Sequence, residues 1–205
     1  MRRLYSRTIM SENTETGTAH HTMRATAKTT KAETVDRTIV LVGLMGSGKS
    51  TIGRRLAAAL NLPFVDADAE IEIAAGMSVT EIFDKFGEDH FRSGERRVIA
   101  RLMSGPRCVL ATGGGAFINP ETRALILEKA LCIWLDTDVH TLAERVARRD
   151  TRPLLRGKNP VAVLTELAAV RNPIYATAHL RVSSTRSPHE RTVDRILEEL
   201  TAWQA

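Results

Sequence analysis

Short, mostly apolar runs alternate with segments of helical periodicity from residue 38 to the end of the chain. Five runs are brief and rich in Val, Ile and Leu, which is typical of strands that are buried on both faces. They cover residues 38–42, 63–66, 108–111, 131–135 and 180–182. Strands that alternate with helices through one domain predict a parallel α/β sheet.

Three of the intervening segments carry helix start signals. Ser78 with Glu81 three residues later forms a capping box, and Ser187 with Glu190 repeats the device before an apolar stripe of helical spacing. Asn119 is followed directly by proline, the pairing of an N-cap with a first helical residue. These signals predict helices that begin close to each of the three positions.

Residues 1–36 differ from the rest of the chain. They contain nine Thr, show no hydrophobic period and never place more than two apolar residues together. Such a segment cannot bury enough surface to offset its ordering entropy, so we expect a disordered extension. The early arginines resemble a transit peptide, but Glu12 and Glu15 argue against one. The alternatives are a solvated extension or a working chain that starts at Met10 or Met23, and the folded domain is predicted over 37–205.

The composition is that of an ordinary globular protein. Of its 205 residues, 43% are hydrophobic and 26% charged, while aromatic residues make up only 4%, so the core must rest on aliphatic side chains. No apolar run approaches the roughly 20 residues that a membrane-spanning helix needs. Cys108 and Cys132 lie within apolar runs without metal-ligand spacing, which predicts buried packing and fits a cytoplasmic protein.

The charge balance leaves two classes of partner open. Lys and Arg number 29 against 24 Asp and Glu, a net charge of +5. A nucleic-acid partner would explain this excess, but the arginines are dispersed and no aromatic residues are interleaved to stack bases. Anionic small molecules explain it equally well. We expect a monomer that binds small molecules and neither nucleic acid nor membrane.

The segment from Gly43 to Ser50 fits the phosphate-binding pattern G-x-x-x-x-G-K-[ST] at every fixed position. A strand is predicted before it and a helix, over 51–60, after it. Glycines let successive N–H groups face inward as an anion nest, and the helix points its positive end at the same place. The predicted contacts to ATP come from this segment and the next residue: Gly46, Ser47, Gly48, Lys49, Ser50 and Thr51. Lys49 supplies charge to the β- and γ-phosphates, and the Ser50 hydroxyl is expected to ligate Mg²⁺.

Two carboxylates follow the second predicted strand. Asp66 and Asp68, two positions apart, are expected to project from the same face of the extended strand end. In a doubly wound sheet the ligand crevice lies beyond the carboxyl ends of the strands. Asp66 is then expected to hold a magnesium-bound water, and Asp68 to orient or deprotonate an attacking hydroxyl. The alternative is that Asp68 merely caps the next helix.

Three glycines, 113–115, follow the third predicted strand directly. Consecutive glycines at a strand end let a ligand lie against bare backbone, although a simple turn remains an alternative. Arg92 and Arg171 have no obvious local partner and could together grip a carboxylate, whereas each alone could be a solvated or paired surface charge. The basic segment 149–160 predicts a mobile lid that carries Arg152 onto the transferring phosphoryl group, with a plain loop as the alternative.

Taken together, these motifs closely resemble the shikimate kinase family in order and spacing, over about residues 37 to 203. They are the phosphate loop, Asp66-x-Asp68, Phe91-Arg92-x-x-Glu95, the glycine run, Arg152-Pro-Leu-Leu155 and Arg171-x-Pro-x-Tyr175. The resemblance implies a nucleoside-monophosphate-kinase-like P-loop fold: three α/β/α layers, a parallel sheet of order 2-3-1-4-5 and a lid at about 150–160. A departure is Gly94, which is expected to loosen the helix that carries Arg92.

The resemblance also implies roles for individual residues. The shikimate-binding set would be Asp68, Arg92, Gly114, Gly115 and Arg171, with the arginines on the carboxylate. Lys49, Asp68 and Arg152 would be catalytic, and Ser50 would ligate Mg²⁺. Either Arg148 or Arg149 would lie near adenine. The implied reaction is ATP + shikimate → ADP + shikimate 3-phosphate, in chorismate and aromatic amino acid biosynthesis.

Two rivals stay open at this point. Another small-molecule kinase of the same fold, for gluconate or a nucleotide, would share the phosphate loop. A P-loop regulatory or nucleic-acid-binding module would account for the positive charge, and steep salt-dependent DNA binding would favour it. The lack of an N-K-x-D guanine-reading motif disfavours a GTPase switch.

Overall fold

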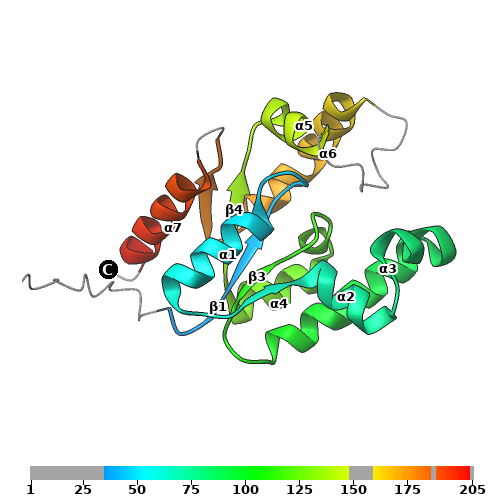
Figure 1. The fold of residues 1–205 in the computed structure, drawn as a ribbon, viewed down its shortest axis with the longest axis horizontal. Helices are drawn as coiled ribbons and strands as arrows, with labels where there is room; N and C mark the ends of the chain where they lie inside the picture. The colour runs from blue at the N-terminus through cyan, green and yellow to red at the C-terminus, as the bar shows by residue number, and fades with distance from the viewer. Residues whose placement is uncertain (1–34, 148–158, 186–187, 204–205) are drawn as a thin grey trace, which may run out of the picture. The chain divides into compact units, whose positions relative to one another are not determined.

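The computed structural model describes residues 35–147, 159–185 and 188–203. Its five strands form one parallel sheet in the order β2-β3-β1-β4-β5 (Figure 1). The strands are β1 (Thr38–Val42), β2 (Phe64–Asp66), β3 (Val109–Ala111), β4 (Ala130–Asp136) and β5 (Leu180–Ser183). All five strand predictions and the strand order are confirmed, with bounds that differ by a residue or two.

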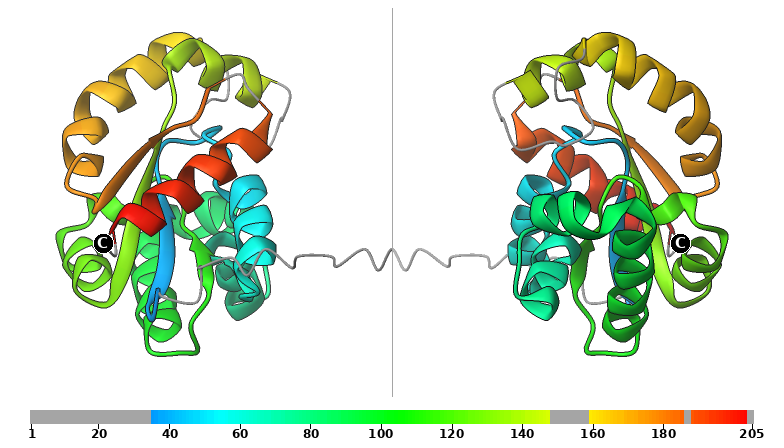
Figure 2. Two further views of the ribbon diagram at one scale, coloured as in Figure 1. Left: turned by 90° about the vertical axis from the view of Figure 1, so that its left-hand side faces the viewer. Right: turned by 90° about the vertical axis from the view of Figure 1, so that its right-hand side faces the viewer.

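Helices cover both faces of this sheet. They are α1 (Lys49–Leu60), α2 (Ala67–Ala75), α3 (Val79–Met103), the 3₁₀ turn η2 (Ala116–Ile118), α4 (Pro120–Lys129), α5 (Val139–Ala147), α6 (Pro160–Tyr175) and α7 (His189–Trp203). Figure 2 shows α1 (cyan) beside α7 (red), and both helices share one core with the sheet face that carries Ile39 and Leu41. Val40 and Val42 point into the other core, together with residues of α3, α4, α5 and α6. The three-layer prediction is confirmed.

The strand pairing brings the carboxyl ends of the central strands to one edge. Leu41 pairs with Ala111, Asp66 pairs with the same Ala111, and Val42 pairs with Trp134. The segments that follow β1, β2 and β3 therefore emerge side by side. In an open parallel sheet this edge is where ligands bind.

Helix α3 contains a break that positions its second half. Ser78 caps its start, and the capping box with Glu81 is present in both directions, as the sequence predicts. Gly87 has φ 80° and ψ 174°, which interrupts the helix five residues before Arg92. Gly94 has helical backbone conformation, and the interruption lies at Gly87 instead. The expected loosening at Gly94 stays a prediction.

Some of the remaining predictions can be compared with the structure, and others concern residues outside the described ranges. The side chain of Asn119 caps α4 ahead of Pro120, as predicted. Ser187 lies outside the described residues, and α7 begins at His189. Both cysteines are buried in the core that contains Val40 and Val42, and neither forms a disulfide. Among the described helices, none is both long and apolar enough to cross a bilayer. The predicted extension, except Val35 and Asp36, and the lid through residue 158 lie outside the described residues.

Candidate active site

The loop between β1 and α1 has the backbone conformation that its glycines predict. Gly43, Gly46 and Gly48 have φ of 138°, 83° and 93°. Gly48 is also the N-cap residue of α1, so the first N–H groups of that helix open into the loop. Backbone N–H groups and the positive end of the helix dipole thus face the same concave space, which is an anion-binding arrangement.

Lys49 lies across this loop. Its Nζ donates to the carbonyl oxygens of Gly43 and Leu44, at 2.9 Å each, and lies 3.5 Å from Ser47 Oγ. The side chain is almost fully buried. These contacts place the ammonium of Lys49 inside the loop that forms the anion-binding nest.

Ser50 and Asp66 connect the phosphate loop to the end of β2. The Ser50 hydroxyl donates to Asp66 Oδ2 at 2.7 Å, and Asp66 Oδ1 accepts the N–H of Asp68 at 3.2 Å. Asp66 is therefore the residue that caps α2, and the alternative role of Asp68 as that cap is wrong. Asp68 lies in the first helical turn rather than on an extended strand end, because β2 stops at Asp66.

Arg145 is a site residue that the sequence reasoning missed. Its Nη1 donates to the carbonyl of Gly46 at 3.2 Å and its Nη2 to that of Thr185 at 2.7 Å. Burial lowers the pKa of its guanidinium. The available signal was its position three residues after Leu142, near the buried face of α5. Arg148 and Arg149, which the sequence favoured instead, lie outside the described residues, as does Arg152.

These residues border a cavity of about 630 Å³. Its lining comes from the phosphate loop, the ends of β2 and β3, and helices α5 and α7: Gly46, Gly48, Lys49, Ser50, Thr51, Asp66, Asp68, Thr112, Gly113, Gly114, Thr141, Glu144, Arg145, Val146, Pro188 and His189. Ser47 is fully buried beneath the loop and does not line the cavity. Within the described residues, no cluster of three or more His, Cys, Asp or Glu side chains could hold a metal ion.

A second, smaller cavity of about 70 Å³ adjoins the first. Its lining comes from the phosphate loop, α2, α3, the glycine segment and α6: Met45, Asp68, Val79, Phe83, Phe91, Arg92, Glu95, Gly113, Gly114, Gly115 and Arg171. Asp68, Gly113 and Gly114 border both cavities. A ligand in the smaller cavity and a ligand in the larger one would therefore meet at Asp68.

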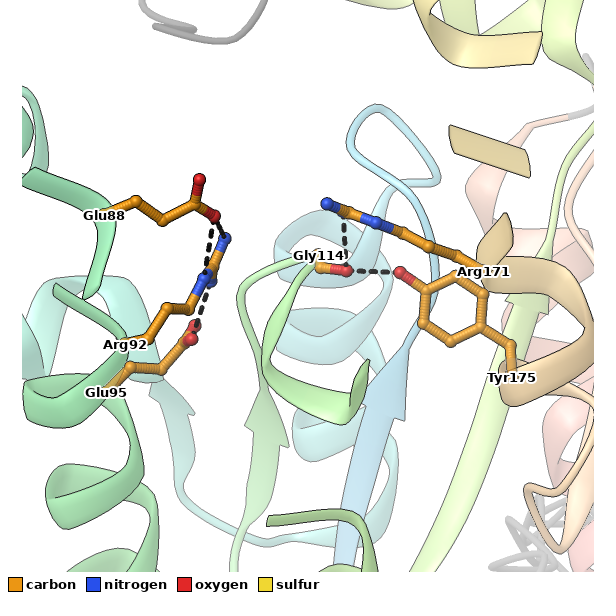
Figure 3. Close-up of polar contacts among 6 residues, drawn as sticks. All are labelled: Glu88, Arg92, Glu95, Gly114, Arg171 and Tyr175. Carbon is orange, nitrogen blue, oxygen red and sulfur yellow. Dashed lines mark hydrogen bonds and ion pairs between the residues drawn. The ribbon is translucent and has the colours of Figure 1, made fainter. Parts of the chain in front are cut away.

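Arg92 is held by two carboxylates of its own helix. Its Nε and Nη2 bond Glu88 at 3.2 and 3.0 Å, and its Nη1 bonds Glu95 at 2.7 Å (Figure 3). The expectation that Arg92 lacks a local partner is wrong. Its guanidinium also lies flat against Gly115, where an added Cβ would come within 2.5 Å of Cζ. Burial raises the pKa of Glu95, and the positive charge of Arg92 opposes that rise.

Arg171 enters the smaller cavity from the other side, on α6. Its Nη1 donates to the carbonyl of Gly114 at 3.2 Å, and the hydroxyl of Tyr175 donates to the same oxygen. Figure 3 shows Arg92 and Arg171 on opposite sides of Gly114. Two guanidinium groups from separate helices thus border one small space beside Asp68, an arrangement suited to an organic anion with hydroxyl groups.

The comparisons with known proteins concern this same stretch of chain. The family model described as "Shikimate kinase" matches residues 45–201. A shikimate kinase from Caulobacter vibrioides is 62% identical over 164 residues, which cover 80% of this chain and 82% of the relative.

Solved structures give the same family. The structure of shikimate kinase from Acinetobacter baumannii in complex with shikimate has a TM-score of 0.80 and 37% identity, and the match covers 83% of this chain and 95% of that one. A gluconokinase from Sinorhizobium meliloti has a TM-score of 0.52 at 21% identity over 82% of this chain and 98% of that one, which is a likeness of fold alone.

Proposed function

The chain belongs to the shikimate kinase family and carries that family's activity, and we propose how its residues divide the reaction. The γ-phosphoryl group of ATP passes to the 3-hydroxyl of shikimate, which gives shikimate 3-phosphate, ADP and a proton. A bond forms between that hydroxyl oxygen and the γ-phosphorus as the bond from the γ-phosphorus to the leaving oxygen of ADP breaks.

ATP occupies the larger cavity, with its phosphates in the nest formed by the phosphate loop. Gly46, Gly48 and Thr51 offer backbone and hydroxyl donors at the start of α1. Lys49 turns its ammonium from the loop carbonyls toward the β- and γ-phosphates, since a phosphate is the stronger acceptor. Arg145 lies where α5 borders the cavity and contributes its charge at the nucleotide side.

Mg²⁺ fits the pair Ser50 and Asp66. Both offer hard oxygen ligands 2.7 Å apart at the edge of the nucleotide cavity. Magnesium takes few protein ligands and completes its shell with water and phosphate oxygens. Ser50 would ligate the ion directly and Asp66 through water. When bound, the ion supplies charge neutralisation between the β- and γ-phosphates.

Shikimate occupies the smaller cavity. Arg92 and Arg171 bind its carboxylate from opposite sides, because planar guanidinium groups offer paired N–H donors to a carboxylate. Gly114 and Gly115 offer bare backbone against which the ring lies. Asp68, at the junction of the two cavities, holds the reacting hydroxyl.

In the transfer step Asp68 accepts the proton of the 3-hydroxyl as that oxygen attacks the γ-phosphorus. Lys49 stabilises the charge that spreads over the phosphoryl oxygens, and Arg152 is predicted to join it from the lid. The rest of the rate enhancement comes from holding donor and acceptor in line and from excluding water, which competes as an acceptor.

The observation that carries this assignment of roles is the position of Asp68 between a phosphate nest and a pair of guanidinium groups. Its test is a coupled assay of ADP release with Mg²⁺–ATP and a panel of acceptors. We expect turnover with shikimate and none above background with gluconate or nucleoside monophosphates. Absence of turnover with shikimate would overturn the function, and a preference for gluconate would replace it. That the protein is a cytoplasmic monomer without a nucleic-acid partner stays a prediction.

A further inference from the structure

The carbonyl oxygen of Gly114 receives two donors from the same helix. Arg171 donates through Nη1 at 3.2 Å, and Tyr175 donates through its hydroxyl (Figure 3). The two residues are four positions apart on α6, so they project from one face of that helix. A carbonyl has two lone pairs, and both are used here. The peptide that joins Gly114 to Gly115 is therefore fixed by α6.

Burying the hydroxyl of Tyr175 at this position costs free energy unless the group makes a hydrogen bond. The side chain is fully buried, and its ring packs against Phe117 and Trp134 with centroids 6.4 and 6.1 Å away. A phenylalanine ring would fill the same space without a polar atom to satisfy. Burial raises the pKa of the Tyr175 phenol to about 12, so the group remains a donor throughout the working pH range.

The orientation of this peptide matters for the acceptor cavity. In a trans peptide the N–H points opposite to the carbonyl. Since the Gly114 carbonyl faces α6, the Gly115 N–H faces away from α6, and Gly115 itself packs against the Arg92 guanidinium of α3. By fixing this one peptide, the Tyr175 hydroxyl influences three groups of the cavity. They are the Arg171 guanidinium, which shares its acceptor, the Gly115 N–H, and the backbone of Gly115 against which Arg92 packs.

We propose that the Tyr175 hydroxyl is a positioning group for the acceptor: it fixes the Gly114–Gly115 peptide and with it the Arg171 guanidinium that receives the substrate carboxylate. The proposal rests on the function given above, and it adds a residue that does not itself touch the substrate. Loss of the hydroxyl leaves the carbonyl with Arg171 alone. Arg171 is then hydrogen-bonded to a peptide that can change its orientation. The affinity for the acceptor should therefore fall, while the rate of the chemical step stays the same.

The test is Tyr175→Phe, which removes one oxygen and keeps the ring. We expect the KM for shikimate to rise about three- to tenfold, the range of one neutral hydrogen bond. We expect kcat and the KM for ATP to stay within about twofold. Calorimetric titration of shikimate without ATP should show the same loss in Kd, which separates binding from turnover.

Ile126→Val is the matched control. Ile126 is fully buried in the same core as Tyr175, on α4, and the change also removes one heavy atom. Its KM for shikimate should equal that of the wild type. The proposal is overturned if Tyr175→Phe leaves the shikimate KM unchanged, if both variants raise it alike, if the KM for ATP rises with it, or if the variant does not fold. A wild-type protein without shikimate turnover would instead overturn the proposed function, and this proposal with it.

Discussion

The two halves of the site are built in different ways. The phosphate half, residues 43–51 with Arg145, is almost one continuous segment whose binding groups are backbone N–H groups and a single buried ammonium. The acceptor half draws on four separate segments: Asp68 on α2, Arg92 and Glu95 on α3, the glycines at 113–115, and Arg171 and Tyr175 on α6.

Charge is also handled differently in the two halves. Lys49 donates to the backbone carbonyls of Gly43 and Leu44, within its own loop. Arg92 is already paired with Glu88 and Glu95 before any acceptor arrives. The phosphate half therefore places a buried ammonium next to the nest of backbone N–H groups. The acceptor half supplies a preset geometry for recognition, in which each side chain depends on its neighbours. Changes in the first should cost rate and nucleotide binding, whereas changes in the second should cost acceptor binding. Asp68 is the exception, because it lines both cavities and takes part in the transfer itself.

The largest expected effect is that of Lys49→Met. Methionine has a comparable length but no charge, so the phosphoryl group loses its cationic partner in both the bound and the transition state. We expect kcat/KM for ATP to fall roughly 10³- to 10⁵-fold, the range for loss of a cation that stabilises phosphoryl transfer. Steady-state kinetics with varied ATP measures this.

Shikimate binding by Lys49→Met tests whether the two halves of the site are separable. The calorimetric Kd for shikimate should equal that of the wild type, because Lys49 belongs to the phosphate half. Lys129→Met, an exposed change in the last turn of α4, controls for loss of a lysine and should leave both constants alone. A shikimate Kd that weakens as much as ATP binding would mean that the two halves are not separable.

Asp68→Asn is expected to rank second. The amide keeps the size of the carboxylate but cannot take the hydroxyl proton, so kcat should fall roughly 10²- to 10⁴-fold, the usual contribution of a general base. ATP affinity should stay near the wild-type value. Asp89→Asn, the same chemical change at an exposed position on α3, should leave turnover intact. Loss of nucleotide binding in Asp68→Asn would contradict its place at the junction.

The contrast between the halves also explains how far the sequence could be interpreted. Gly43 to Ser50 act through backbone conformation, which their order along the chain encodes, so the pattern predicts the loop directly. Arg145 lies 99 positions from the Gly46 carbonyl that it contacts, and only the packing of α5 brings them together. Arg92 pairs with Glu88 and Glu95 at i,i+4 and i,i+3 spacing on one helix, so this pairing was visible in the sequence and was overlooked. The helix break at Gly87 was not predicted. Tyr175 was visible in a motif, but its partner at Gly114 was not.

Gly115→Ala tests the acceptor half by geometry alone. The added Cβ would lie 2.5 Å from Arg92 Cζ, so the guanidinium must leave its place. Loss of charge-assisted hydrogen bonds predicts a rise of about 10- to 100-fold in the KM for shikimate, with the KM for ATP within twofold.

Gly94→Ala is the matched control on α3, because an added Cβ there meets nothing within 4 Å. It should leave both constants unchanged and stabilise the helix by about 0.5–1 kcal/mol. If both substitutions raise the shikimate KM equally, the contact between Gly115 and Arg92 does not position the guanidinium for the acceptor.

The smallest effect concerns His189, which lines the nucleotide cavity and not the acceptor cavity. Burial, helped by Arg145 and Arg55, lowers the pKa of this imidazole below its usual 6.5. Between the folded-state pKa and 6.5 the unfolded chain binds more protons than the folded one, so the contribution of His189 to stability is present above 6.5 and is lost as pH falls through the folded-state pKa.

The test uses His189→Gln, because glutamine does not titrate. The Tm of the wild type relative to His189→Gln should therefore decline by less than about 2 °C from pH 7 to pH 5, since the ring is partly exposed. Thermal melts in matched buffers measure the difference, and a wild-type Tm that rises relative to His189→Gln toward acid would contradict the expected sign. The shikimate Kd should be the same for both proteins at every pH, because the histidine belongs to the phosphate side of Asp68.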